Sequence, residues 1–160
     1  MKIKDIFKVV LLSCIALLAE ACDIKIKERP QSAAATFSID HYAINVEDMD
    51  RSVAFYQDIF DLKEIKDGTE LDHIRWFQLG SSEELHIIQV DSLDKKLPKG
   101  VHIALRTLDL EGFRESLTKK NIPYSDWPGK ANEVSLRPDG VHQLYIQDPD
   151  GYWIEVNDAN

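Results

Sequence analysis

A short segment that occurs twice is the feature that most limits what this chain can fold into. The first copy is His41-Tyr-Ala-Ile-Asn-Val-Glu-Asp48 and the second is His102-Ile-Ala-Leu-Arg-Thr-Leu-Asp109. In each copy an alanine comes two residues after the histidine and an aspartate comes seven residues after it. Such a repeat predicts two copies of one small unit that share a core, because a unit of this size cannot bury both faces of its own sheet.

Each copy is followed by an amphipathic helical pattern and then by short strand-like runs. The first apolar helix face contains Met49, Val53, Phe55, Tyr56, Ile59 and Phe60, and the second contains Leu110, Phe113 and Leu117, with Ile122 just beyond it. Asp48 and Asp109 suit helix starts, since a short acceptor can satisfy free backbone amides there. The strand-like runs are 62–65, 74–79 and 85–90 in the first half and 122–124, 132–137, 143–147 and 153–156 in the second.

We interpret both halves as the order strand–helix–strand–strand–strand, with one additional run in the second half. This order differs from the strict alternation of a doubly wound parallel sheet. We expect an α+β fold in which two tandem modules share a curved sheet. Module 1 covers about residues 37–96 and module 2 about residues 100–158, with Pro98–Gly100 at the boundary. Two arrangements fit the repeat: the modules pair within one chain, or they pair across a homodimer.

The N-terminus has the pattern of an export signal. Lys2, Lys4 and Lys8 precede an apolar run over residues 9–19, and Ala19-Glu-Ala21 fits a small-x-small cleavage site. The run is short for a membrane span. We therefore interpret residues 1–21 as a signal peptide, with an uncleaved anchor as the alternative.

Cys22 directly follows the expected cleavage site, as in a bacterial lipoprotein signal, although Glu20 departs from the small or apolar residue usual there. No cysteine follows Cys22, so the body has no internal disulfide, and lipidation would cap a lone exported thiol. The sequence thus predicts a protein exported to the periplasm or cell surface and anchored to a bacterial membrane by a lipid on Cys22. Residues 22–36, which carry charges and Pro30, are expected to form a tether.

The charge of the body argues against nucleic acid as a partner. The chain has a net charge of -9 at pH 7 and a pI near 5.0. Contacts to phosphates need clustered Lys and Arg, so generic nucleic-acid binding is not expected. A small-molecule ligand remains compatible with this charge.

Four residues form the candidate metal site. His41 and His102 hold equivalent places in the first strand of each half, and His86 and Glu155 lie in the last strand of each half. Strand alternation places Glu155 on the opposite side from Ile154 and Val156, as a charged group in an otherwise apolar strand. Histidine and carboxylate groups that converge from repeated modules are typical metal ligands.

The remaining histidines, His73 and His142, have no repeat partners of this kind and are interpreted as surface or pocket-rim residues. Asp148-Pro-Asp-Gly151 is interpreted as a tight turn, because proline fixes φ and glycine allows a positive φ. The residues expected to contact a substrate, from strands and loops, are Arg75, Trp76, Trp127, Arg137 and Tyr145.

Four segments together resemble the vicinal oxygen chelate superfamily, which includes glyoxalase I, fosfomycin-resistance and bleomycin-resistance proteins and extradiol dioxygenases. These segments are Ile39-Asp-His-Tyr-Ala-Ile-Asn-Val46, Ser52-Val-Ala-Phe-Tyr56, Val101-His-Ile-Ala-Leu105 and Gln147-Asp-Pro-Asp-Gly-Tyr-Trp-Ile-Glu-Val156. The resemblance covers about residues 37–158. It implies paired βαβββ modules that form a partly open, glyoxalase-like barrel around one divalent metal ion.

By the family pattern, the metal ligands map onto His41, His86, His102 and Glu155. The metal is expected to be Zn, Ni, Mn, Fe or Co, since this donor set suits several ions. In glyoxalase I the residue at the place of His86 is usually glutamate, so this chain would keep one carboxylate at the metal.

The resemblance favours a metal-dependent lyase or isomerase of the glyoxalase type that acts on a small oxygen-chelating substrate, with Glu155 as ligand and catalytic base. One alternative is a non-catalytic protein that sequesters a drug or metabolite. Another is an extradiol-type ring-cleaving dioxygenase, which uses two histidines and one carboxylate. If His86 points away from the metal, the other three residues make that triad.

Overall fold

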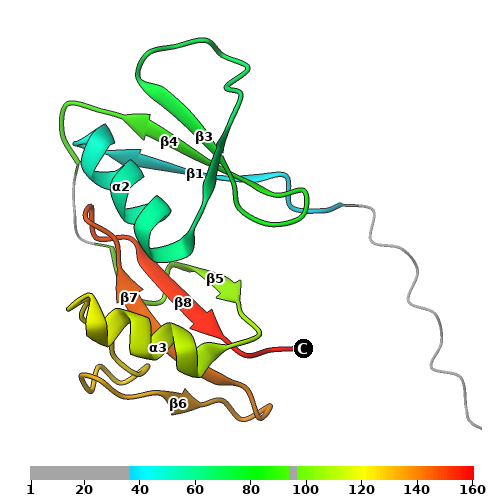
Figure 1. Ribbon diagram of the computed structural model, residues 1–160, viewed down its shortest axis with the longest axis vertical. Helices are drawn as coiled ribbons and strands as arrows, with labels where there is room; N and C mark the ends of the chain where they lie inside the picture. The colour runs from blue at the N-terminus through cyan, green and yellow to red at the C-terminus, as the bar shows by residue number, and fades with distance from the viewer. Residues whose placement is uncertain (1–36, 94–96) are drawn as a thin grey trace, which may run out of the picture. The chain divides into compact units, whose positions relative to one another are not determined.

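The two repeats form two modules with the same order of elements. The computed structural model describes residues 37–93 and 97–160 (Figure 1). The predicted signal peptide, the tether and Cys22 lie outside the described residues. The chain divides into the units Met1–Ser38 and Ile39–Asn160, and both modules belong to the second unit. Within the described residues, no helix is both long and apolar enough to cross a membrane.

The predicted order of elements is confirmed in both modules. Module 1 contains β1 (His41–Val46), α2 (Met49–Phe60), β2 (Lys63–Ile65), β3 (Ile74–Gln78) and β4 (Glu84–Gln89). Module 2 contains β5 (His102–Arg106), α3 (Leu110–Lys119), β6 (Ser135–Leu136), β7 (His142–Gln147) and β8 (Trp153–Asn157). The sheets have the equivalent orders β1-β4-β3-β2 and β5-β8-β7-β6, and in each the first strand runs parallel to the last.

Both helices begin where the repeated aspartate lies. The Asp48 side chain accepts a hydrogen bond from the amide of Arg51, and the Asp109 side chain accepts one from the amide of Gly112. Each aspartate therefore satisfies one of the amides that a helix start leaves free. The repeat thus specifies both the histidine that begins the strand and the helix start that follows it.

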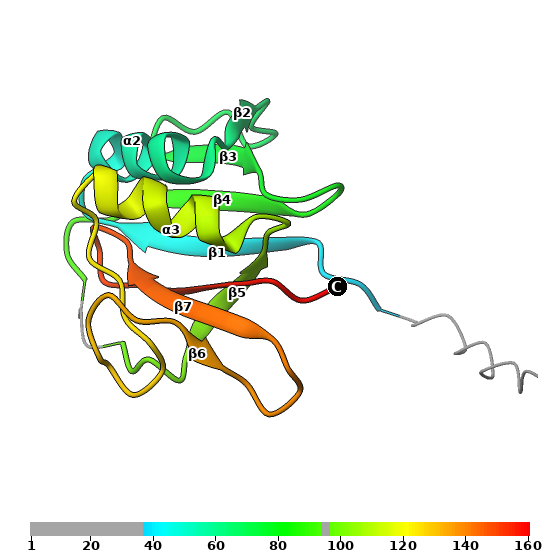
Figure 2. The same cartoon turned by 60° about the horizontal axis from the view of Figure 1, so that its bottom comes forward.

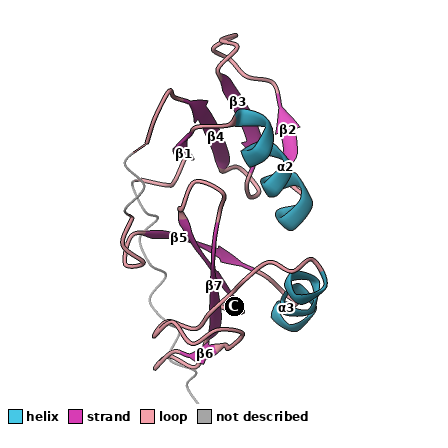
Figure 3. Ribbon diagram, turned by 90° about the vertical axis from the view of Figure 1, so that its left-hand side faces the viewer, coloured by secondary structure: helices cyan, strands magenta, loops and turns pink. Residues whose placement is uncertain are grey.

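The helices cover one side of the two sheets, and His41 and His102 lie on the opposite side. Both helices lie on the same side of the strands (Figure 3) and close to each other (Figure 2). The rings of Phe60 and Phe113 stack between them, with centroids 5.7 Å apart. A single core joins the modules, with Ile44, Ile87 and Ile154 almost fully buried in it. Since strand side chains alternate, the first residue of β1 and of β5 points away from the helices.

One expected strand is wrong. Residues 122–124 form no strand; only Ser125 makes isolated bridges, to Ala131 and Tyr145. Pro123 lies inside this run and has no amide proton to donate to a ladder. The run expected at 132–137 is also shorter than expected and forms only β6.

The Asp148–Gly151 segment is a tight turn, as predicted, and it also holds the two modules together. Gly151 has a φ of 92°, and its amide donates to the Asp148 carbonyl at 3.1 Å. The buried Asp148 carboxylate accepts a hydrogen bond from the Tyr56 hydroxyl at 2.8 Å. The buried Asp150 carboxylate accepts one from the Ser52 hydroxyl at 2.7 Å. Both donors belong to α2, so the turn of module 2 is attached to the helix of module 1.

Candidate metal centre

The repeated alanine explains how each histidine reaches a residue on the neighbouring strand. In module 1 Ala43 is the register partner of His86, and in module 2 Ala104 is the register partner of Glu155. The histidine two residues earlier lies on the same face of the strand. Because an alanine side chain is short, that histidine can lean across it toward the partner of the alanine. The His-x-Ala pattern therefore builds one pair of neighbouring side chains in each module.

In module 1 this pair is His41 and His86, whose rings stack. Their centroids are 4.2 Å apart and their planes differ by 11°. Trp76, the register partner of His86 on β3, stacks on the other side with its centroid 4.1 Å from that of His86 and an interplanar angle of 5°. His41 Nδ1 lies 2.7 Å from Asp40 Oδ2, and His86 Nε2 lies 2.8 Å from Glu84 Oε2.

In module 2 the equivalent pair is His102 and Glu155. His102 Nε2 lies 3.2 Å from Glu155 Oε2. Tyr145, the register partner of Glu155 on β7, donates its hydroxyl proton to Glu155 Oε2 at 2.5 Å. Each module therefore carries a histidine, a central residue and an aromatic residue on three adjacent strands.

Glu155 is a buried carboxylate that is fully supplied with hydrogen-bond donors. Glu155 is 4 % exposed. Its Oε1 accepts hydrogen bonds from Asn157 Nδ2 at 2.7 Å and from the Arg137 guanidinium at 3.3 Å. Burial alone would raise the pKa of Glu155. The hydrogen bonds from Tyr145 and Asn157, with the charges of His102 and Arg137, outweigh burial and lower this pKa. Glu155 is therefore kept as an anion.

The surroundings of His102 determine which of its nitrogens faces Glu155. Nδ1 lies 2.8 Å from the carbonyl oxygen of Lys99, which can only accept a hydrogen bond, so Nδ1 carries the proton in this contact. If the imidazole is neutral, Nε2 then carries a lone pair that faces the Glu155 carboxylate. Two acceptors 3.2 Å apart need a proton or a metal ion between them.

Lys99 fixes the strand entry that carries His102. Its Nζ donates to the Ser125 hydroxyl at 3.0 Å and to the Asp126 carbonyl at 2.5 Å. The same ammonium group lies 4.7 Å from the ring centroid of Tyr145 and 4.8 Å from that of Trp153. Burial lowers the pKa of Lys99, and the Asp126 charge opposes this shift. The linker between the modules is thereby attached to the loop beside the His102–Glu155 pair.

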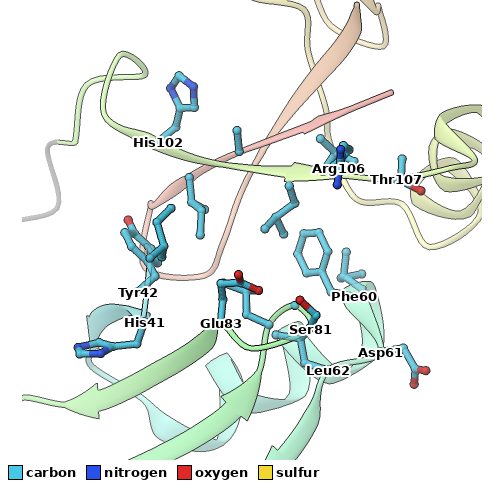
Figure 4. A pocket seen from close by; sticks show the side chains of 18 of the residues that line it. His41, Tyr42, Phe60, Asp61, Leu62, Ser81, Glu83, His102, Arg106 and Thr107 are labelled. Carbon is cyan, nitrogen blue, oxygen red and sulfur yellow. The ribbon is translucent and has the colours of Figure 1, made fainter. Parts of the chain in front are cut away.

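The two pairs do not come together within one chain. Among residues 37–93 and 97–160, no three His, Cys, Asp or Glu side chains converge closely enough to hold a metal ion. The rings of His41 and His102 point away from each other at the edge of a cleft of about 1190 Å³ (Figure 4). This cleft separates β1 from β5, and its wall includes Phe60 and Leu105.

The residues expected to contact a substrate fall into two groups. Trp76 lies in the stack of module 1, while Tyr145, Arg137 and Trp127 surround the pair of module 2; the ring of Trp127 lies 5.5 Å from that of Tyr145. Arg75 instead shares a face with the buried Phe77 and forms an ion pair with Glu64, on the side of the sheet that the helix covers. Alternation along β3 separates Arg75 from its neighbour Trp76.

The other two histidines, His73 and His142, are exposed, and His142 Nδ1 lies 2.9 Å from Asp158 Oδ2.

Sequence reasoning missed two residues that support the pair of module 2, Lys99 and Asn157. The alternation of β8 gave a signal for Asn157, because it shares a face with Glu155. The linker position of Lys99 gave no comparable signal.

The repeat, the sheet order and the two equivalent side-chain groups agree with one family. Residues 38–156 match the family described as the Glyoxalase/Bleomycin resistance protein/Dioxygenase superfamily. The chain belongs to this superfamily. It is also 33% identical over 127 residues to the protein YwbC of Bacillus subtilis (strain 168), covering 73% of this chain and 94% of YwbC.

Solved structures of the superfamily share this fold. A putative glyoxalase family protein from Bacillus anthracis is 25% identical, with a TM-score of 0.63 over 80% of this chain and 99% of its own. The fosfomycin resistance protein FosX from Listeria monocytogenes is 21% identical, with a TM-score of 0.62 over 79% of this chain and 96% of its own. Lactoylglutathione lyase from Agrobacterium tumefaciens is 21% identical, with a TM-score of 0.58 over 76% of this chain and 93% of its own.

Superfamily members commonly use a divalent metal ion, and the donors here fit such an ion in part. The His102–Glu155 pair presents a nitrogen and a carboxylate oxygen on one side, with the other ring nitrogen held by a backbone carbonyl. That arrangement is usual for metal-binding histidines. The module 1 pair supplies further imidazole nitrogens from a separate sheet.

Proposed function

We propose that this protein is an exported, metal-dependent lyase or isomerase of the glyoxalase type that acts on a small substrate with two adjacent oxygen atoms. One observation carries this proposal: His102 Nε2 and the buried Glu155 carboxylate face each other at 3.2 Å, a distance at which the two groups hold either a proton or a cation between them. A divalent cation satisfies both acceptors, and the equivalent group of module 1 offers the remaining nitrogen ligand.

We assign three ligands to the metal: His41, His102 and Glu155. A metal ion lies in the plane of the imidazole that binds it, about 2.0–2.1 Å from the nitrogen. The parallel rings of His41 and His86 are stacked at 4.2 Å, so an ion in the plane of one ring lies far from the plane of the other. His41 is the more exposed ring, with 42% of its side chain accessible against 12% for His86. It also keeps Nε2 for a ligand, since Nδ1 contacts Asp40.

We propose that a second copy of the chain completes each site. The His41 group and the His102–Glu155 pair lie in separate sheets of one chain and do not converge there. A symmetric dimer would bring His41 of one protomer to the pair of its partner, and it would form two such sites. This choice corresponds to the homodimer arrangement that the repeat allowed.

The bound ion would supply a Lewis acid that polarises a substrate oxygen. Glu155 would hold the anionic position beside it, and the Tyr145 hydroxyl donates a hydrogen bond to its Oε2 at 2.5 Å, which orients the carboxylate. Arg137 is placed to orient an anionic part of the substrate, since its guanidinium already lies 3.3 Å from Glu155. With three protein ligands, open positions remain for a bidentate substrate.

The same stack favours a second candidate, an extradiol-type dioxygenase. Two histidines and one carboxylate with open positions are the ligands that non-haem iron oxygenases use. This candidate predicts iron as the metal and oxygen consumption with a catechol substrate. Metal content and oxygen uptake therefore separate the two reactions.

The export part of the proposal rests on the sequence of residues 1–22 and has its own test. Intact-mass analysis of protein from bacterial membranes should show a lipid on Cys22 as the new N-terminus. A mature chain with a free Cys22 amine and thiol would contradict the lipid anchor without affecting the metal site.

The proposed function is tested by metal analysis of the body from residue 23 onward. We expect about one divalent ion per chain, as two equivalent sites in a dimer require, and strong loss of binding in Glu155→Gln. The matched control is Glu115→Gln, which changes an exposed glutamate on α3. A wild-type body that binds none of the five candidate ions would refute metal dependence and favour the non-catalytic binding protein.

A further inference from the structure

His86 lies at the centre of the module 1 stack, yet the three-ligand site does not use it. Its ring is held between His41 at 4.2 Å and Trp76 at 4.1 Å, and the three rings are nearly parallel. They come from β1, β4 and β3, so adjacent strands each contribute one ring. The exposed His41 forms the outer layer, and the less exposed His86 forms the middle one.

The inner part of the stack is fixed by its surroundings. Glu84 Oε2 lies 2.8 Å from His86 Nε2 and restrains rotation of the middle ring. At the edge of the Trp76 ring, the backbone of Gly68 lies so close that an added Cβ would be 3.3 Å from the indole. The Trp76 and His86 rings therefore form a fixed surface against which the ring of His41 rests.

His41 itself has little else to hold its ring in place. Within residues 37–93 and 97–160, the other interaction of its ring is with Asp40, whose side chain is 92% exposed, and exposed ion pairs of this kind contribute little. Without the stack, the ring would rotate freely and would have to be ordered when a metal binds. Groups that orient a ligand residue in advance are known to strengthen metal binding.

We propose that His86 is a positioning residue: it is the stacking platform that fixes the His41 imidazole for metal binding, and it is not itself a ligand. The claim that the platform strengthens metal binding rests on the proposed function. The claim that His86 holds the ring of His41 in place does not. It gives a role to the residue that replaces a glutamate ligand in glyoxalase I. The flat ring of His86 is the part that contacts His41, while its Nε2 serves only to hold that ring against Glu84.

The test compares His86→Phe, which keeps a flat ring without nitrogens, with His86→Ala, which removes the ring. Zn²⁺ affinity is measured by calorimetry on the full body. We expect His86→Ala to bind Zn²⁺ about tenfold more weakly and His86→Phe to stay within about threefold of wild type. The matched control is His142→Ala, which removes an exposed histidine outside both groups.

A second readout needs no metal. In the metal-free protein, NMR shifts of the His41 ring protons should carry the ring-current effect of the stack in wild type and His86→Phe, and lose it in His86→Ala. If His86→Phe loses Zn²⁺ as strongly as His86→Ala, His86 is a ligand and the proposal is overturned. If neither variant changes the shifts, His86 is no platform. If wild type binds no metal, the proposed function fails, and the NMR comparison alone decides the role of His86.

Discussion

The buried carboxylate of Asp150 provides the sharpest test of how the two modules are held together. It accepts hydrogen bonds from the Ser52 hydroxyl at 2.7 Å, the Glu47 amide at 3.1 Å and the Arg51 guanidinium at 3.1 Å. All three donors belong to module 1. The Asp150 side chain is completely buried, whereas 46% of the Arg51 side chain is exposed.

Asp150→Ala leaves the Ser52 hydroxyl and the Glu47 amide without their acceptor. A buried donor left unsatisfied costs about 1–3 kcal/mol, and the Glu47 amide is only partly buried, so we expect the free energy of unfolding to fall by about 2–4 kcal/mol. Asp150→Asn should cost far less. Its oxygen can serve the Glu47 and Arg51 donors while its amide donates to Ser52, so it loses mainly an ion pair with a half-exposed arginine, about 0.5–1 kcal/mol.

The assay is urea unfolding of the body, with the exposed Asp72 changed to Ala as the matched control. The expected order of the free energy of unfolding is wild type, then Asp150→Asn slightly lower, then Asp150→Ala much lower. Equal losses for the two Asp150 variants would show that charge, rather than hydrogen bonding, holds the turn. A loss below about 1 kcal/mol in Asp150→Ala would refute the attachment itself.

Three further changes have defined outcomes. Burial raises the pKa of Asp148 above 3.8. The stability that its protonated form contributes is therefore present at low pH and is lost as pH rises through the raised pKa. Asparagine does not titrate, so in urea titrations Asp148→Asn should become more stable relative to wild type between pH 4 and 7. Lys99→Met releases the linker that holds His102, and Zn²⁺ affinity by calorimetry should fall about tenfold. Tyr145→Phe removes the 2.5 Å hydrogen bond to Glu155, and we expect a similar loss.

Matched controls exist for the last two changes. Lys130→Met removes a lysine whose side chain is 72% exposed, and Tyr124→Phe removes a hydroxyl that contacts only Arg114 among the described side chains, at 3.4 Å. Neither control should change Zn²⁺ affinity. Unchanged affinity in Lys99→Met or Tyr145→Phe would mean that these residues only stabilise the fold. A pH-independent stability difference for Asp148→Asn would contradict the raised pKa.

The sequence predicted the modules because their signals are local. The repeated histidine and aspartate placed the first strand and the helix start in each half, and the apolar spacing gave both helices. The alternation of β3 also contained the information that Arg75 and Trp76 face opposite ways. The expected strand at 122–124 failed because Pro123 weakens a short run that apolar content alone favoured.

The sequence predicted which side chains of the candidate site pair within each module, but not how the two pairs lie relative to each other. Equivalent positions in the repeat identified the pairs His41–His86 and His102–Glu155, and both pairs are in contact. The expectation that all four residues meet depended on how the modules are arranged, which no local pattern specifies. Long-range contacts such as Asp150 to Ser52 decide that arrangement, and the turn motif at 148–151 gave no sign of its partner.

Mixing two defective variants tests the central claim, that half-sites from two copies of the chain hold one metal ion. His41→Ala and Glu155→Gln are each prepared, shown to bind Zn²⁺ weakly, and then unfolded and refolded together in equal amounts. Random pairing gives mixed dimers with one intact site, so about a quarter of the wild-type Zn²⁺ sites should return. If the wild type binds Zn²⁺ tightly but the mixture recovers none, the site lies within one chain and the claim is contradicted.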